Sequence, residues 1–529
     1  MNREQLSDAI GRLDDEMIGA VGNRRRRKPW WYSAVAVAAC VALVLGAVAV
    51  WPHLRHDGDH PPVDTPDVSA TDDTTVTTKE TTTATKSTTT TATESTTATK
   101  HTQKVTHGSV PPAKSAGLLA APQYPQMVKR PKSDGDGYSF DNYKQWRDSV
   151  KKQRAKIEGQ TDGMTDFYSR TFRTFLEGND GENRLYSPLN VYLALSMLAE
   201  TTEGNSRRQI LKLLGVSGIS DLRDKSSALW NGVYMDDGAV TCRLANSLWL
   251  RNDEEYRYDM NAVKRLSNHY FASVYSGEMG SKAYDKELQA WLNKQTNGLL
   301  EKQTSQQGFD EKTALALAST VYFSARWFSE FRETKTDTFY TADGEKRCNY
   351  LCKKTAQDAT FGDRFTCVSL KLDDGDYRMM FFRPNEGTTA SELLTDRQML
   401  QVMQGDEAET ETKRMRVDMS IPKFDVSSDR DLTSGLKSLG VTDVFNESKS
   451  DFGGIIDKQD EPVVLADANH AVRVAIDEEG VTAAAYTEIR MANTSVPQDV
   501  LEFTLDKPFV FAITGPGNTI LFAGVVENP

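Results

Sequence analysis

The stretch Ile476-Asp477-Glu478-Glu479-Gly480-Val481-Thr482-Ala483-Ala484-Ala485-Tyr486-Thr487-Glu488-Ile489-Arg490-Met491 decides the fold. Every second residue from Val481 onward is uncharged, and these residues are Val481, Ala483, Ala485, Thr487, Ile489 and Met491. A period of two is typical of a strand with one buried face. Loop residues follow, among them Asn493, Ser495 and Pro497. The stretch therefore fits either an edge strand before a turn or a loop that is able to become a strand.

Composition excludes several classes of function. The chain has 529 residues, which predicts more than one segment or domain, and its net charge of -12 argues against a nucleic-acid partner. Its 5 cysteines are too few for a disulfide framework, and Cys348 and Cys352 lack histidines at metal-ligand spacing. We found no glycine-rich phosphate loop and no G-x-S-x-G motif. We therefore expect no enzyme activity, no metal and no cofactor.

The N-terminal region has the pattern of a membrane anchor. Residues 1–29 are polar and end in a basic cluster, and residues 33–51 are uncharged, with aromatic residues at both ends of that run. The basic cluster predicts a cytoplasmic N-terminus, a single transmembrane helix over 33–51 and an extracellular C-terminal part. A cleaved signal peptide, and a lipoprotein cleavage box before Cys40, are the alternatives.

The next segments look like a stalk and a linker. Residues 52–110 are rich in threonine and cannot bury enough apolar surface to order themselves, so we expect a disordered extracellular stalk. Residues 111–160 remain polar and are expected to be a linker, with a short helix over Asp141–Lys156. From residue 161 to the end, apolar strand patterns alternate irregularly with helical ones, which predicts an α+β domain.

Sequence blocks along this domain resemble one family in order. Leu185-Tyr186-Ser187-Pro188 opens a buried helix, and further blocks follow at Leu244–Trp249, Trp291–Gly298, Val321–Trp327, Ile421–Phe424, Leu439–Phe445, Lys507–Phe509 and Phe522–Pro529. Together these blocks are similar to those of the serpins, the serine protease inhibitors. The resemblance implies a fold with three β-sheets, eight or nine helices and an exposed reactive-centre loop.

The resemblance also implies a mechanism and a set of site residues. A protease cuts the loop, which then inserts into the central sheet and carries the acyl-linked protease away from its starting position. The hinge that enters first is matched by Glu478, Glu479, Gly480, Val481, Thr482, Ala483, Ala484 and Ala485. Val481 stands where the family usually has threonine. After cleavage the inserting face would continue through Thr487, Ile489 and Met491.

The family's spacing places the reactive bond at Thr494–Ser495. A small residue at the cut favours an elastase-like or subtilisin-like protease. Cleavage after Arg490, by a trypsin-like protease, is the alternative, although it would leave a shorter inserting segment.

A buried polar cluster is also implied, with one departure from the family. Serpins usually have a serine on the buried helix and an asparagine on a nearby central strand, with a histidine beside them. Here the helix offers Ser187 and Asn190, the strand offers Ser319, and the histidine is His470. Because buried donors and acceptors have to be paired, we expect the amide and the hydroxyl to have exchanged places.

We therefore expect a surface-displayed, irreversible inhibitor of serine proteases, acting as a monomer through a covalent acyl complex, with cysteine proteases as a second target class. The anchor and stalk favour a bacterial cell envelope. A non-inhibitory binding protein with the same fold, and a surface adhesion module, are the alternatives.

Overall fold

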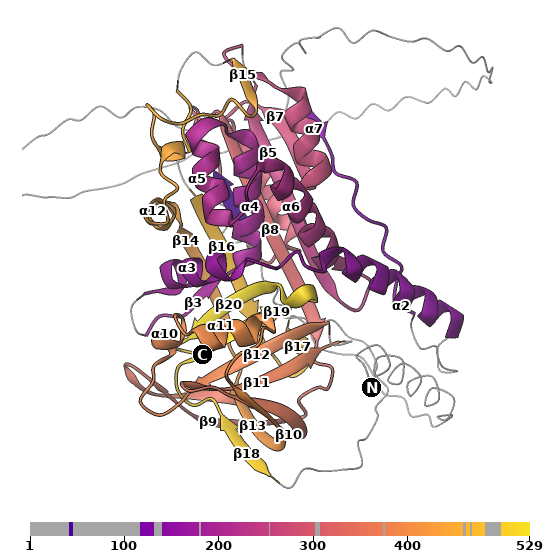
Figure 1. The fold of residues 1–529 in the computed structure, drawn as a ribbon, viewed down its shortest axis with the longest axis vertical. Coiled ribbons are helices and arrows are strands. Elements are labelled where there is room, and N and C mark those ends of the chain that lie inside the picture. Colours follow the sequence, from indigo (N-terminus) through magenta and orange to yellow (C-terminus); the bar gives the residue numbers. More distant parts are fainter. Residues whose placement is uncertain are drawn as a thin grey trace, which may run out of the picture. The chain divides into compact units, whose positions relative to one another are not determined.

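The computed structural model describes residues 42–45, 117–131 and 140–529, except for 179–180, 253, 302–306, 374–375, 459–461, 466–467 and 482–498. All of these belong to one unit of the chain, which comprises residues 1–49 and 112–529. Figure 1 shows its helices and sheets.

Ten α-helices lie in the described part of the chain, and they are α2 (Phe140–Arg154), α3 (Thr165–Leu176), α4 (Pro188–Thr201), α5 (Gly204–Leu214), α6 (Ile219–Val233), α7 (Met260–His269), α8 (Lys282–Gln295), α10 (Ala390–Leu393), α11 (Arg397–Gln404) and α12 (Thr433–Ser438). The described residues also include three short 3₁₀ helices, η2 (Ala155–Ile157), η3 (Asp443–Phe445) and η4 (Pro516–Asn518).

Local sequence explains where several helices begin and end. Pro188 occupies the first turn of α4, where its missing N–H has no partner to lose. Asp259 caps α7 by accepting hydrogen bonds from two backbone N–H groups, and Asp396 caps α11 in the same way with one. Gly405 ends α11 at a φ of 67°, in the left-handed region that glycine adopts easily. All residues of α4 are buried, because this helix contacts β8 on one side and β20 on another.

The larger sheet has nine strands, in the order β18-β13-β10-β11-β12-β19-β20-β3, with β9 paired to β10. Its strands are β3 (Arg184–Tyr186), β9 (Glu333–Thr341), β10 (Gly344–Phe361), β11 (Phe365–Leu372), β12 (Tyr377–Pro384), β13 (Glu411–Pro422), β18 (Val500–Thr504), β19 (Phe509–Thr514) and β20 (Ile520–Val526). β18 is an edge strand and runs parallel to β13.

The central sheet is divided into two parts that share no strand. One part has the order β17-β8-β5-β7-β2, with β4 paired to β5, and the other has the order β1-β16-β14. Their strands are β1 (Ala42–Leu45), β2 (Gly117–Ala120), β4 (Met235–Asp236), β5 (Thr241–Arg251), β7 (Ala272–Gly277), β8 (Leu315–Arg326), β14 (Asp425–Asp431), β16 (Ala468–Ala475) and β17 (Gly480–Val481). A separate pair, β6 (Arg257–Tyr258) and β15 (Ile456–Lys458), completes the strands.

The predicted α+β class is confirmed, and Figure 1 shows α4, α5 and α6 lying over the central strands β5, β8 and β16. Residues 117–131 and 140–160, expected to be a linker, contact the domain, and apolar side chains among them, such as Trp146 and Ile157, are buried in this contact. The helix expected near Asp141–Lys156 is α2.

The expected membrane helix over 33–51 stays a prediction, because only residues 42–45 of that stretch belong to the described part of the chain. Ala42–Leu45 form strand β1, which is antiparallel to β16 and contacts β8. Without β1, the side of β16 that faces β8 would have unpaired backbone groups, and an edge of this kind can bind any extended segment. No helix among the described residues is both long and apolar enough to cross a bilayer, and the rest of 33–51 lies outside those residues.

Candidate functional site

The hinge begins with a tight turn that the side chain of Asp477 stabilises. Its Oδ1 accepts hydrogen bonds from the backbone N–H of Glu479 at 2.8 Å and of Gly480 at 3.0 Å. The Asp477 N–H in turn donates to the Gly480 carbonyl at 3.0 Å. Short acidic side chains stabilise turns in this way. The acidic run before Gly480 therefore reverses the chain immediately after β16.

The turn places the next two residues between the two parts of the central sheet. Gly480 and Val481 form β17 and pair with Arg326 and Ala325 at the end of β8, while Val481 also forms a bridge to Ile476. The Val481 side chain is 0% exposed. The first residues of the hinge thus already lie in the sheet, with one neighbour on each side.

Gly480 is required for close approach of two backbones. A Cβ at this position would lie 2.3 Å from the Ala325 carbonyl oxygen and 2.7 Å from Arg326 Cα. Both of these atoms belong to the backbone of β8, so a side chain could not be relieved by a rotamer change. The φ of Gly480 is not among the positive values, so its backbone conformation does not require a glycine. Space, rather than backbone conformation, selects the residue.

Backbone and side-chain groups just after β8 and just after β13 hold the turn against the sheet. Trp327 donates from its backbone N–H to the Glu479 carbonyl at 3.0 Å and from Nε1 to the Asp477 carbonyl at 2.8 Å. The Phe331 N–H donates to the Glu478 carbonyl at 3.1 Å. Lys423 Nζ forms an ion pair with the Glu478 carboxylate.

The Lys423 ion pair changes the acidity of Glu478. Partial burial of the carboxyl group is the largest single effect and acts to raise its pKa, but the hydrogen bond from Lys423, a backbone hydrogen bond and the charge of Lys423 together outweigh burial, and the pKa is lowered from its ordinary value. Glu478 is therefore ionised at neutral pH and holds Lys423 beside the turn.

The other predicted loop residues lie outside the described part of the chain. These are the hinge residues Thr482, Ala483, Ala484 and Ala485, the inserting residues Thr487, Ile489 and Met491, and the reactive-bond residues Thr494 and Ser495. Their segment, 482–498, connects β17 in the central sheet to β18 at the edge of the nine-stranded sheet.

The buried polar residues form two groups rather than one. Ser319 Oγ lies 2.6 Å from Asn190 Oδ1 and 2.7 Å from Asn246 Oδ1. Asn246 stands opposite Ser319 on β5 and donates from Nδ2 to the Tyr270 carbonyl at 2.6 Å. Because a hydroxyl carries one hydrogen, the two amide oxygens share a single donor. This group joins α4 to the strands β5 and β8.

The second group contains Ser187 and His470. The Ser187 N–H donates to His470 Nε2 at 3.2 Å, and Ser187 Oγ donates to the Leu521 carbonyl at 2.6 Å. Among the described residues, His470 Nδ1 has no hydrogen-bond partner. Burial lowers the pKa of His470 from 6.5 to about 3, so the ring is neutral at physiological pH. The structure thus pairs Asn190 with Ser319 and Ser187 with His470, and the proposed exchange of amide and hydroxyl stays a prediction.

Sequence reasoning missed Asn246, Lys423 and the role of Trp327. Asn246 had a signal, since it is a polar residue within the apolar run Leu244–Leu250. Lys423 had none, because a surface lysine next to a strand is common and its partner is distant in sequence.

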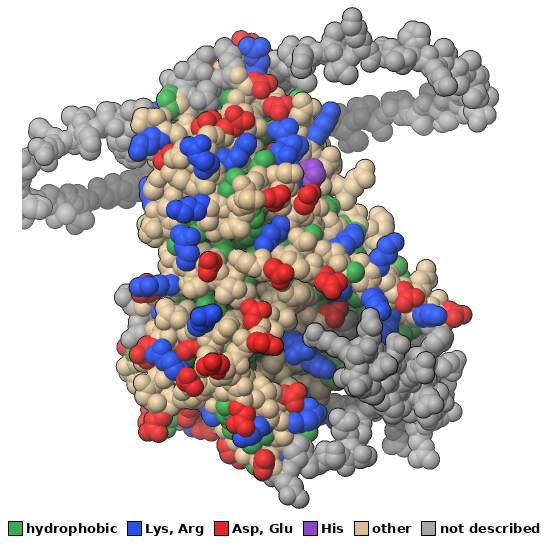
Figure 2. All heavy atoms as spheres, in the orientation of Figure 1, with side chains coloured by type: hydrophobic (Ala, Val, Ile, Leu, Met, Phe, Trp, Pro, Cys, Tyr) green, Lys and Arg blue, Asp and Glu red, His purple; other side chains and the backbone are tan. Residues whose placement is uncertain are grey.

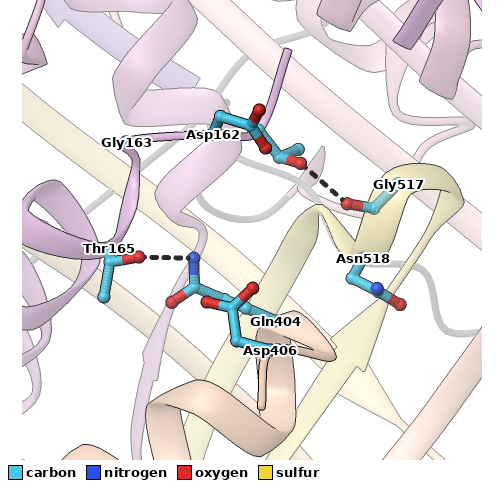
Figure 3. Close-up of a pocket in the computed structure, with 8 residues that line it drawn as sticks. Asp162, Gly163, Thr165, Gln404, Asp406, Gly517 and Asn518 are labelled. Carbon is cyan, nitrogen blue, oxygen red and sulfur yellow. Dashed lines mark hydrogen bonds between the residues drawn. The ribbon is translucent and has the colours of Figure 1, made fainter. Parts of the chain in front are cut away.

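Figure 3 shows a second polar feature, a cavity of about 170 Å³ where the start of the domain meets η4 and the end of α11. Thr161 Oγ1 donates to the Gly517 carbonyl at 3.0 Å, and Gln404 Nε2 donates to Thr165 Oγ1 at 3.1 Å. In the described residues, no group of three His, Cys, Asp or Glu side chains could hold a metal ion. On the face drawn in Figure 2, acidic and basic side chains are interspersed.

Comparisons with known proteins agree with this architecture. The family model described as Serpin (serine protease inhibitor) matches residues 162–529. Serpin B11 of Mus musculus is 28% identical over 391 residues, which cover 70% of this chain and 99% of that protein. The leukocyte elastase inhibitor of Equus caballus is 26% identical over 385 residues, covering 70% and 100%. The crystal structure of the thermophilic serpin tengpin in its native state has a TM-score of 0.62 at 21% identity, covering 69% and 93%.

Proposed function

The chain belongs to the serpin family of serine protease inhibitors, and from this premise we propose that it traps its target protease irreversibly by inserting its own cut loop into the central sheet. Family membership also means that it is not an enzyme, because the protease supplies the chemistry. The finer points below, which are the suicide mechanism, the target and the location, are our proposals.

The proposed reaction begins at the carbonyl carbon of Thr494. The catalytic serine of the protease attacks this carbon, the Thr494–Ser495 peptide bond breaks, and the new amine of Ser495 takes a proton from the protease. The protease is then held to Thr494 by an ester. If the loop inserts before water hydrolyses that ester, the protease is displaced and its active site distorts. Inhibition is therefore a competition between insertion and hydrolysis.

The single observation that carries the proposal is the position of Val481, which is paired with β8 and fully buried. This buried residue pairs with Ala325 of β8 on one side and with Ile476, directly after β16, on the other, so it supplies the first step of a new central strand in the uncut chain. Each further residue can extend β17 by pairing with both neighbours. The alternation from Ala483 to Met491 supplies the uncharged face that such a strand needs.

The position of β1 supports the same geometry. β1 pairs antiparallel with β16, at Ala471 through Ala468, which indicates room for one strand between β16 and β8. In the register of the Ile476–Val481 bridge, an inserted loop would place Tyr486 opposite Ala471 and Ile489 opposite Ala468. Loop insertion therefore requires β1 to leave that place.

We propose an elastase-like or subtilisin-like target, because the residues at the bond are small and polar. Cysteine proteases are the second target class, since a thiolate can attack the same carbonyl carbon. The covalent complex would contain one copy of this chain, as each copy has its own loop and its own seat for it.

We further propose that residues 33–51 anchor the protein in a cell membrane, with residues 1–29 in the cytoplasm and the inhibitor outside on its Thr-rich stalk. The uncharged run, the preceding basic cluster and the flanking aromatic residues support this location, and a bacterial envelope suits it. Anchoring would also withdraw Ala42–Leu45 from β16 and leave that strand to the loop.

The proposal is tested by mixing the full chain, purified in detergent, with an elastase-like serine protease. We expect an SDS-resistant complex, and mass spectrometry should find a released C-terminal peptide that begins at Ser495. The matched control is the same protease with its catalytic serine blocked beforehand, which should form no complex. Clean cutting of the loop, with no complex and no rise in melting temperature, would refute the inhibitory mechanism.

The membrane proposal has its own test. Cells expressing the full chain should retain it in the membrane fraction and expose the inhibitor domain to a reagent that labels only the outside. A variant without residues 33–51 should lose both properties. Membrane retention of that variant would overturn the anchor.

A further inference from the structure

The residues just before the serpin domain are bound to it along their whole described length. The family match begins at residue 162, whereas β2, the chain from Pro122 to Pro131, α2 and η2 all precede it. Residues 117–131 and 140–160 are together called the clasp here. Figure 1 shows this part running beside α7 and then into α2 along the side of the domain.

The clasp first closes the outer edge of the central sheet. β2 pairs antiparallel with β7, with Gly117 opposite Ser276, Leu118 opposite Tyr275 and Ala120 opposite Val274. β7 is otherwise the last strand of the part that contains β8 and β5. In the proposed mechanism, this part and β16 have to stand apart along the whole length of the inserted loop, beyond the short stretches where β17 and β1 now lie.

The clasp next stacks on α6, which leads into β4 and β5. The Tyr124 ring lies 5.3 Å from the Trp230 ring and 5.8 Å from the Tyr234 ring, and it is nearly parallel to both. Trp230 is itself stacked on Phe271, just before β7, at 3.8 Å. One aromatic column thus joins the clasp to α6 and to the start of β7.

Polar contacts then join the clasp to the turn between α6 and β5. The Arg130 N–H donates to the Asp237 carbonyl at 2.9 Å, and Trp146 Nε1 donates to Asp237 Oδ2 at 3.0 Å. The Arg130 guanidinium lies 5.0 Å from the centre of the Trp146 ring. Trp146 is 2% exposed. Both halves of the clasp therefore meet at one residue, Asp237, in the turn that precedes β5.

The same residues also bind the nine-stranded sheet. Arg130 forms an ion pair with Asp373, and Arg154 pairs with Asp376 at 3.0 Å, so both reach the turn between β11 and β12. Arg154 also donates to the Gly232 carbonyl of α6 at 2.8 Å. At the end of the clasp, Thr161 is bonded to Gly517 of η4, as Figure 3 shows.

The clasp therefore ties the part of the central sheet that contains β7 and β5 to the nine-stranded sheet. Moving β7, β5 and α6 relative to the β11–β12 turn would break the contacts of Tyr124, Arg130 and Arg154 together. We propose that the clasp, residues 117–131 and 140–160, restrains the opening of the central sheet and thereby sets how slowly the uncut loop inserts. This inference rests on the proposed function, since it concerns the stability of the inhibitory state.

The test compares Tyr124→Ala with Tyr340→Ala, which removes an exposed tyrosine ring from β9. Full-length variants are incubated at elevated temperature without protease, and samples are assayed for covalent complex formation. Loss of the aromatic stack should make Tyr124→Ala lose inhibitory activity about tenfold faster than the unmodified chain. Tyr340→Ala should keep the original half-life. Equal half-lives for the two variants would overturn the restraint.

Two further measurements keep the inference testable. Trp146→Phe retains an apolar ring but cannot donate to Asp237, so it should fold and still shorten the half-life. Hydrogen exchange should rise at β7 and at the end of α6 in Tyr124→Ala, whether or not the chain inhibits any protease. If the unmodified chain forms no complex, the proposed function fails, whereas unchanged exchange at β7 and α6 would defeat the clasp.

Discussion

Two short strands extend opposite edges of the same part of the central sheet, and they are held very differently. At the inner edge, β17 has two residues, and a turn, a few backbone hydrogen bonds and one half-exposed ion pair hold it on β8. At the outer edge, β2 has four residues, and the chain that follows it adds an aromatic stack and the buried Trp146 and Ile157.

This difference corresponds to what each edge has to do. An exposed sheet edge pairs with whatever strand is available. In the proposed mechanism, the inner edge has to accept the chain's own loop, and the small Gly480 and the buried Val481 at its start fit that task. The outer edge has to refuse any further strand, and the clasp that closes it also binds other parts of the domain. A sheet that has to gain a strand during its function needs one edge that accepts this strand, which is the inner or permissive edge, and one edge that stays closed, which is the outer edge.

The strongest test of the inner edge is Val481→Arg. A charge at this fully buried site would cost several kcal/mol without a partner, so β17 should detach and the cut loop should fail to insert. We expect at least about tenfold less covalent complex for each loop that is cut, with the protease released active. Gel analysis of complex and cleaved chain at fixed ratios of protease measures this.

Val500→Arg is the matched control, because Val500 is 43% exposed on β18 at the far end of the loop. Its yield of complex should equal that of the unmodified chain. If Val481→Arg also inhibited normally, the buried position of Val481 in β17 would have no part in the mechanism, and the two edges would not differ in function.

The corresponding test of the outer edge is Trp146→Ala. This indole is 2% exposed and bonded to Asp237, so its removal should lower the free energy of unfolding by about 3–5 kcal/mol. Denaturant unfolding of the uncut full-length chain measures the loss, and Phe328→Ala, at a ring that is 52% exposed, serves as the control. A loss no larger than that of the control would show that the clasp only rests on the surface.

The sequence was informative about one edge and silent about the other. The alternation from Val481 predicts a strand with one buried face, and the resemblance of the ordered blocks from Leu185 onward to the serpins predicts that this strand begins at a hinge. The apolar run over 240–250 predicts a strand, which the structure has as β5, Thr241–Arg251, and the helical pattern over 431–439 predicts α12, Thr433–Ser438. Such elements are predictable because their burial pattern is local.

The clasp could not be found in this way. Tyr124, Arg130 and Trp146 are single residues in a polar segment, and each becomes meaningful only through partners about a hundred or more positions away. For the same reason Lys423 gave no sign of its pairing with Glu478. The apolar run before the stalk predicted a helix from hydropathy alone, although Ala42–Leu45 can equally pair with an open strand such as β16.

A change of pH tests β16, the strand that faces the permissive edge, without altering either edge. His470 has a pKa of about 3 in the folded chain and 6.5 when unfolded, so between these values only the unfolded chain binds the proton. The free energy of unfolding should therefore fall as the pH falls from 6.5, by up to about 1.4 kcal/mol per pH unit. His470→Asn should remove this part of the slope, whereas His269→Asn in α7 should keep it. An unchanged slope in His470→Asn would place the acid sensitivity elsewhere.

The smallest expected effect is that of Glu478→Gln, which removes the ion pair with Lys423 but leaves the turn and β17 intact. The pair is partly exposed, so solvent screens it, and its loss should cost less than about 1 kcal/mol at neutral pH. Because the pKa of Glu478 is lowered in the folded chain, the pair contributes above its ordinary value of 4.5 and is lost as the pH falls below it. The difference in stability between the unmodified chain and Glu478→Gln should therefore vanish in acid and in high salt, while Glu479→Gln, an exposed neighbour, should behave like the unmodified chain. A large loss of stability or of complex formation at neutral pH would mean that a charge, and not the fit of Gly480 and Val481, holds the permissive edge in place.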